Sequence, residues 1–230
     1  TLGVQAVHPI PLDILEGQID AILSDIGADA IKIGMLHTSK VVNLVAEMIE
    51  KYGIRNVVLD PVMVSTSGHK LIEDDAIESI KNRLIPLSRV ITPNIPEAEI
   101  LSGCKISSEQ DFEQIAKKLS FNKSVSVLLK AGHLDNDCLV DYFYNVEDNT
   151  ITLLPSKRVK TRNTHGTGCT LSSAFASALA RGEDLTLAAK SAKKYIEQAI
   201  EFGAEYEIGH GHGPVNHGFN PLKMLTNEVG

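Results

Sequence analysis

The spacing of apolar and polar residues along the chain predicts short strands that alternate with helices. Between residues 12 and 26, apolar side chains recur every three or four positions, and Gly27 ends the pattern as a glycine commonly ends a helix. Further helices are expected over residues 39–52, 74–84, 108–119, 169–181 and 185–202. Short apolar runs predict strands at residues 30–33, 57–59, 90–92 and 125–130.

Strands and helices in this order form βαβ units, which predict an α/β fold with a mainly parallel central sheet and helices on both faces. Residues 138–145 and 151–154 are two extended segments joined by a polar stretch, which predicts a hairpin at the sheet edge. The opening residues 1–7 predict one more strand, and residues 209–221, rich in Gly, His and Pro, predict a loop. Because no internal repeat or long linker occurs, we expect a single domain over residues 1–230.

The composition predicts a globular protein that binds neither nucleic acid nor a membrane. The 230 residues include 22 basic and 29 acidic side chains, and the resulting net charge of −7 disfavours binding to polyanions. No apolar run reaches the roughly 18 residues of a membrane span, and the N-terminal segment has no signal-peptide pattern. Three widely spaced cysteines, Cys104, Cys138 and Cys169, suit reduced thiols, so we expect a cytoplasmic location.

Polar residues follow the predicted strands at their carboxyl ends, where ligands bind to open parallel sheets. Asp60 follows the second strand, Asn94 and Glu97 follow the third, and Lys130 ends the fourth. Carboxylates beside a lysine suit a phosphate ligand with bound Mg²⁺. At any single position the simpler interpretation is a polar residue that caps the next helix. The agreement of several strand ends favours a binding site.

The strongest local signal is the stretch Asn163-Thr164-His165-Gly166-Thr167-Gly168-Cys169-Thr170. Glycines on both sides of Thr167 at a helix start leave backbone N–H groups exposed, and with the helix dipole these make an anion hole. Cys169 in the first turn is a candidate base or nucleophile, because the positive helix end favours a thiolate. The alternative is a glycine-rich turn with an inert cysteine.

Several other features predict little chemistry. The tail histidines, His210, His212 and His217, lack the spacing of a zinc site. His37 and His69 lie among polar residues and are expected to be exposed, whereas methionines such as Met63 commonly fill a core. Neither a Walker A motif nor a dinucleotide fingerprint occurs.

Five motifs, taken in order, resemble one family closely. They are Lys32-Ile33-Gly34-Met35, Val57-Val58-Leu59-Asp60-Pro61-Val62-Met63, Thr92-Pro93-Asn94-Ile95-Pro96-Glu97-Ala98, Lys130-Ala131-Gly132-His133 and the stretch from Asn163 to Thr170. The chain thereby resembles the hydroxymethylpyrimidine/phosphomethylpyrimidine kinases of thiamine biosynthesis, which are members of the ribokinase-like superfamily. The similarity runs from about Gly3 to His217. Cys169 is its specific mark, since most of the superfamily carries Asp there.

The resemblance implies phosphoryl transfer from ATP with Mg²⁺, first to a pyrimidine hydroxymethyl group and then to its monophosphate. It also implies a homodimer. Each role is transferred to the matching residue. Cys169 would activate the hydroxyl and contact the substrate, and the N–H groups around Gly166, Thr167 and Gly168 would stabilise the transferring group. Lys130, Thr164 and His165 would bind ATP, while Asp60, Glu97 and Asn94 would surround Mg²⁺ and phosphate, with Asp60 and Glu97 as the metal ligands. Met35 and Val62 would line the pyrimidine pocket.

The chain departs from the family at its front, where about fifty residues of the family pattern, including part of the substrate pocket, have no counterpart. We therefore keep two alternatives. One is a pyridoxal or pyridoxine kinase of vitamin B6 salvage, since the discriminating residues belong to that segment. The other is a non-catalytic regulator that binds pyrimidines, although nearly every catalytic position holds the expected residue type.

Overall fold

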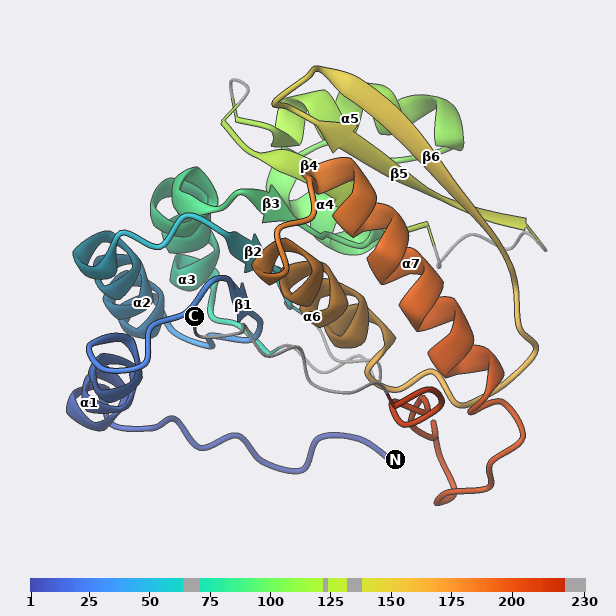
Figure 1. Ribbon diagram of the computed structural model, residues 1–230, viewed down its shortest axis with the longest axis horizontal. Helices are drawn as coiled ribbons and strands as arrows, with labels where there is room; N and C mark the ends of the chain where they lie inside the picture. The colour runs from blue at the N-terminus through green and yellow to red at the C-terminus, as the bar shows by residue number, and fades with distance from the viewer. Residues whose placement is uncertain (64–70, 122–123, 132–137, 222–230) are drawn as a thin grey trace, which may run out of the picture.

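The computed structural model describes residues 1–63, 71–121, 124–131 and 138–221, and within them it forms a six-stranded sheet between two layers of helices (Figure 1). The strands lie side by side in chain order, and the first four are parallel. Their bounds are β1 Ile31–Ile33, β2 Val57–Leu59, β3 Val90–Ile91, β4 Ser126–Leu129, β5 Cys138–Asn145 and β6 Thr150–Lys157. The last two form the antiparallel edge hairpin predicted from the sequence.

Apart from α4, over which no helix was predicted, the helices begin and end close to the residues that the apolar pattern predicts. Their bounds are α1 Leu12–Leu23, α2 Ser39–Tyr52, α3 Asp74–Ser79, α4 Ile95–Ser102, α5 Phe112–Leu119, α6 Thr167–Ala180 and α7 Leu185–Glu201. The predicted helix over residues 74–84 is α3 followed by a π-helical turn, Ile80–Leu84. None of the helices in the described part of the chain has the length and apolar character that crossing a bilayer requires.

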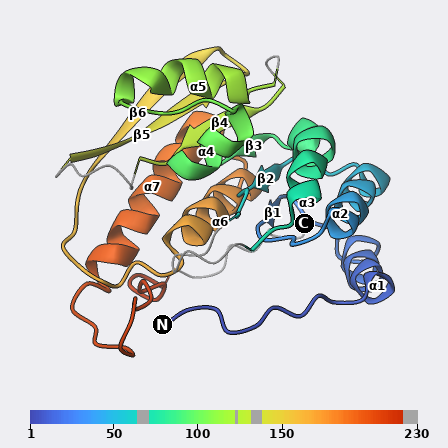
Figure 2. The ribbon, with the colours of Figure 1, turned by 180° about the vertical axis from the view of Figure 1, so that it is seen from behind.

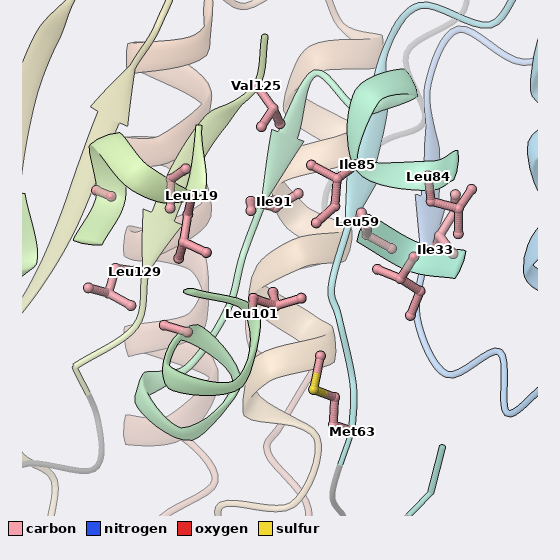
Figure 3. Packing of buried hydrophobic residues seen from close by; sticks show 14 of the residues in the cluster. Ile33, Leu59, Met63, Leu84, Ile85, Ile91, Leu101, Leu119, Val125 and Leu129 are labelled. Atoms are coloured by element: carbon pink, nitrogen blue, oxygen red, sulfur yellow. The ribbon is translucent and has the colours of Figure 1, made fainter. Parts of the chain in front are cut away.

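Alternate residues of each strand face opposite layers, so the sheet separates two hydrophobic cores. On one face Ile33, Leu59 and Ile91 pack against α2 to α5 (Figure 3). On the other, Val58 and Val90 pack against α6 and α7. Figure 2 shows these two layers from behind, with α1 lying outside α2 at the end of the molecule.

The predicted strand at residues 1–7 is wrong. This segment is exposed, pairs with no strand and belongs to no sheet. Its first residue is tied to the tail, where Thr1 accepts hydrogen bonds from the backbone N–H groups of Gly211 and His212. An extended segment forms a strand only when a neighbour takes up its N–H and C=O groups, and local alternation does not supply that neighbour.

Candidate active site

Hydrogen bonds beyond the strands hold their carboxyl ends in register. The Asp60 N–H donates to the Ile33 carbonyl at 2.9 Å, the Thr92 N–H to the Leu59 carbonyl at 3.0 Å, and the Lys130 N–H to the Pro93 carbonyl at 2.9 Å. These bonds extend the parallel ladder by one residue on each strand. They bring side chains that are far apart in the sequence to one edge of the sheet.

Asp60 is the centre of this edge. Its side chain accepts hydrogen bonds from Lys130 at 2.8 Å, Thr92 at 3.1 Å and Ser172 at 3.3 Å, and Lys32 lies 3.8 Å from its Oδ2. Only 1% of Asp60 is exposed. Burial alone would raise the pKa of Asp60, but the charges of Lys130 and Lys32 and the hydrogen bonds outweigh it and hold the pKa below its ordinary value. Asp60 is therefore ionised and joins three strands to α6.

Lys130 supplies a fixed positive charge beside Asp60. Burial would lower the pKa of Lys130, but the negative charges of Asp60 and Glu97 together with the hydrogen bond to Asp60 raise it above its ordinary value. The bond to Asp60 also fixes where the ammonium lies. Such a buried cation suits the charge of a phosphate.

The amino end of α6 meets Lys130 at Gly168. A Cβ atom at Gly168 would lie 3.1 Å from Lys130 Nζ and 3.9 Å from Asp60 Oδ2, so the missing side chain allows this approach. Gly166 precedes the helix with φ +86°, a conformation that favours glycine. The helix thus begins two residues earlier than predicted, and its positive end faces the lysine.

Two backbone donors remain open at this helix start. Among the described residues, no acceptor is bound by the N–H groups of Gly168 and Cys169. The N–H group of Thr167, expected in the anion hole, instead donates to the Thr164 carbonyl at 3.3 Å. Cys169 is exposed in the same turn and lies near Lys130. The open N–H groups, the Lys130 ammonium and the Cys169 thiol therefore lie together at the start of α6.

Asn94 and Glu97 form a capping box at the start of α4. The Asn94 side chain accepts the Glu97 N–H, and Glu97 Oε2 accepts the Asn94 N–H, both at 2.9 Å. The helix-cap interpretation of Asn94 is thus confirmed. Burial raises the pKa of Glu97, and the charge of Lys130 opposes the shift only in part. Glu97 is hence a buried carboxyl beside the lysine as well as part of a cap.

The remaining predicted site residues lie around this centre in different environments. Met35 is 39% exposed after β1, and Val62 is half-buried after β2. The His165 N–H donates to the Gly213 carbonyl at 2.9 Å, which places Thr164 and His165 in a loop held by the C-terminal tail. No group of three or more His, Cys, Asp or Glu residues suited to a metal occurs in the described ranges.

The predictions for the histidines need one correction. His37, expected to be exposed, is partly buried, and its ring nitrogen Nδ1 lies 2.9 Å from the Leu71 carbonyl. His217 lies 2.9 Å from the Thr170 hydroxyl and so contacts α6. His69, with the Gly132-His133 part of the lysine motif, lies outside the described residues.

Three residues of the centre had no predicted role: Lys32, Thr92 and Ser172. Lys32 is the one charged residue of β1, and a lysine between two isoleucines of a strand was a signal that could have been used. Thr92 follows β3 directly and was open to the same argument as Asp60. Ser172 gave no such signal, since it is one small residue among many in α6.

Comparison with known proteins identifies the family. The phosphomethylpyrimidine kinase family model matches residues 1–216. The chain belongs to this family. It is 40% identical over 218 residues to the hydroxymethylpyrimidine/phosphomethylpyrimidine kinase of Rhizobium meliloti and covers 81% of that protein. It is 42% identical over 217 residues to the thiamine biosynthesis bifunctional protein of Geobacter sulfurreducens, of which it spans only 44%. Each match includes 94% of this chain.

Solved structures of the family's relatives confirm the ribokinase-like fold. A pyridoxal kinase of Bacillus subtilis, determined as an ADP complex, superimposes with a TM-score of 0.82 at 34% identity, over 92% of this chain and 79% of that one. A phosphomethylpyrimidine kinase from Clostridium difficile gives 0.74 at 38% identity, over 86% and 80%. The fold and the family therefore agree with the motifs from which they were expected.

Proposed function

We propose that the protein transfers the γ-phosphoryl group of ATP to 4-amino-5-hydroxymethyl-2-methylpyrimidine and then to the resulting monophosphate, in thiamine biosynthesis. The observation that carries this proposal is that Lys130 lies beside the open N–H groups of Gly168 and Cys169 at the start of α6. Phosphoryl transfer depends chiefly on positioning and on stabilising the charge of the transferring group. The family membership and the curated relatives support the choice of substrate.

In the proposed reaction, the substrate hydroxyl oxygen forms a bond to the γ-phosphorus of ATP. The bond from that phosphorus to the oxygen between the β- and γ-phosphates breaks, and ADP leaves with the electron pair. The thiolate of Cys169 accepts the hydroxyl proton, while Lys130 and the α6 amides hold the charge of the transferring group. Thr164 and His165 bind the nucleotide, and Met35 and Val62 line the acceptor pocket.

The residues fit Mg²⁺ that arrives with the phosphates of ATP. Mg²⁺ is commonly held by one or two carboxylates, with phosphate oxygens and waters as its other ligands. Both oxygens of Asp60 already have partners on the protein, while Glu97 uses Oε2 in its cap. The chain therefore offers two partly engaged carboxylates, and the metal, when bound, would neutralise phosphate charge. Asp60 and Glu97 are its proposed ligands.

Pyridoxal kinase activity is the second candidate. Two solved pyridoxal kinases, from Bacillus subtilis and Staphylococcus aureus, superimpose on this chain with TM-scores of 0.82 and 0.83. The curated relatives with high coverage are pyrimidine kinases, which favours the first candidate. We further propose a cytoplasmic homodimer, which the family resemblance and the free thiols of Cys104 and Cys169 support.

The test is ADP release with ATP and Mg²⁺ when the hydroxymethylpyrimidine, its monophosphate and pyridoxal are offered separately. We expect turnover of both pyrimidines and a loss of about 100-fold or more in kcat for Cys169→Ala, the usual scale of removing a general base. Cys104→Ala is the matched control, because this second free cysteine lies by Lys118 rather than at α6, and it should keep wild-type rates. Turnover of pyridoxal alone would replace the first candidate with the second.

A further inference from the structure

Lys32 reaches the centre of the site from the side opposite Lys130. Its neighbour Ile33 faces the core under α2, so the alternation of β1 directs Lys32 to the α6 face of the sheet. From there its Nζ lies 3.8 Å from Asp60 Oδ2, while Lys130 binds Oδ1. Lys32 of β1 and Lys130, the residue after β4, thus flank one carboxylate.

The approach of Lys32 depends on Gly34. A Cβ atom at Gly34 would lie 2.8 Å from Lys32 Nζ, closer than real side chains tolerate. Glycine at this position therefore leaves the space in which the ammonium lies. The side chain therefore runs along its own strand toward the carboxyl edge of the sheet, where Asp60 lies.

The ammonium of Lys32 has donors to spare. Its contact with Asp60 is too long for a hydrogen bond, and in the described ranges no other acceptor is bound to it. Only 18% of the side chain is exposed, so water can satisfy few of its three N–H donors. By contrast, Lys130 donates to Asp60 at 2.8 Å. Buried polar groups normally find partners, so a ligand is the expected partner of Lys32.

The charges at this edge of the sheet favour an anion beside Lys32. Lys32 and Lys130 bring two ammonium groups to the single carboxylate of Asp60. The α6 amides add further positive potential.

We propose that Lys32 binds the phosphate already present on the monophosphate acceptor, and so determines specificity for the second transfer. This inference rests on the proposed function, in which the acceptor lies by Met35 and Val62, next to the strands that carry Lys32 and Asp60. The first acceptor is a neutral alcohol and gives Lys32 nothing to bind. The second carries a phosphate monoester, which needs a cation besides the one that holds the transferring group.

The test compares kcat/KM for the alcohol and for the monophosphate in Lys32→Gln and Lys32→Arg. In Lys32→Gln, the ratio of monophosphate to alcohol efficiency should fall about 10- to 100-fold, the scale of one charge-assisted hydrogen bond, mainly through KM. Lys32→Arg keeps the charge and should keep the ratio within about threefold. Lys105→Gln, at a lysine with an exposed surface ion pair, is the control.

Equilibrium binding of both pyrimidines without ATP gives a second readout that does not depend on turnover. Lys32→Gln should weaken binding of the monophosphate far more than binding of the alcohol. Equal losses for both acceptors would show that Lys32 only balances the charge of Asp60, and would overturn the inference while the proposed function stands. A wild-type protein that phosphorylates neither pyrimidine would overturn the proposed function and the inference together.

Discussion

At the scale of single residues, the site depends on how closely Lys130 approaches a backbone that lacks a side chain. Lys130 is held by Asp60 on one side and lies against Gly168 on the other. A free lysine could move away from an added methyl group, but one fixed by a buried carboxylate cannot move without losing that bond. Gly168 is therefore required by the position of its neighbour, since its own backbone lies in an ordinary helix.

Gly168→Ala should lower kcat/KM about 10- to 100-fold, because displacing a positioned group by a fraction of an ångström is costly in catalysis. The free energy of unfolding should change little, because the gain of about 1 kcal/mol from alanine's higher helix propensity offsets the cost of the close contact with Lys130. Gly17→Ala is the matched control: it lies inside α1 with nothing within 4 Å of the added Cβ, and should leave activity unchanged. Steady-state kinetics and thermal unfolding measure both effects. Full activity in Gly168→Ala would show that Lys130 has freedom to move.

The predictability of the site follows the same residues. Asp60 and Lys130 were predicted because each directly follows a strand, where topology alone determines the place of a side chain. Lys32 was not, because its ammonium reaches the site by folding over Gly34, which depends on a side-chain path and not on strand order. Glu97 was predicted as a metal ligand but not as the partner of Asn94 in a cap.

At the scale of elements, helices whose apolar residues form one stripe were predictable, and α4, whose apolar and charged residues are mixed, was not. α2 has an apolar stripe, a Thr38 cap and Gly53 in the left-handed region, and its predicted bounds agree with the structure. α4 buries Ile95, Ala98 and Leu101, but it also buries Glu97 and leaves Ile100 41% exposed, so its apolar and charged residues are not separated onto two faces. Its apolar pattern therefore carries no helical period, and its start is marked only by the cap.

α1 represents the opposite case, a helix without any buried residue. It packs on α2, where its Asp20 accepts hydrogen bonds from Lys51 and the Tyr52 hydroxyl. The hydrogen bond from Lys51 lowers the pKa of Asp20 from its ordinary 3.8. An acid with a lowered pKa in the folded state stabilises at higher pH, so this contribution is complete above that value and is lost as the pH falls below it.

Asp20→Ala should therefore loosen α1 while the rest of the molecule stays folded. We expect lower amide protection factors in α1, an unchanged unfolding midpoint for the two cores, and α1 protection factors that no longer fall at acid pH. Asp25→Ala, which removes a nearby carboxylate just beyond the helix, is the control and should behave as the wild type. Exchange in α1 that equals the wild type in both variants would mean that apolar contacts alone hold the helix.

At the scale of the whole molecule, strand order and the two helical layers followed from the chain pattern, whereas contacts between distant loops did not. Parallel strands joined by helices restrict the topology strongly, and the observed sheet obeys that restriction. The tail is different: its Gly, His and Pro content predicts a loop but not where the loop lies. In the structure it folds back onto the segment before α6, with His165 paired to Pro214.

Hydrogen bonds from Asn163 hold the segment before α6 against the residues that follow α7, and Gly213 in the tail leaves space for the Asn163 side chain. Asn163 is 1% exposed and donates at 2.7 Å to the carbonyls of Gly203 and Tyr206. A Cβ atom at Gly213 would lie 2.0 Å from Asn163 Oδ1, so no side chain fits there without moving Asn163. Because Asn163 lies just before Gly166, any displacement passes to the helix start that carries the open amides.

Gly213→Ala should consequently destabilise the protein by about 1–3 kcal/mol, the usual cost of overpacking, and lower kcat at temperatures where the variant is still folded. Gly218→Ala is the control within the same tail, because its added Cβ would have an ordinary contact at 3.6 Å with Asn216. Denaturant unfolding gives the free energies, and ADP release gives the rates. If Gly213→Ala unfolds like the wild type, the tail can shift away from Asn163 freely. A loss of stability with full kcat in the folded fraction would instead show that the packing of the tail against Asn163 stabilises the fold without affecting the position of the α6 amides.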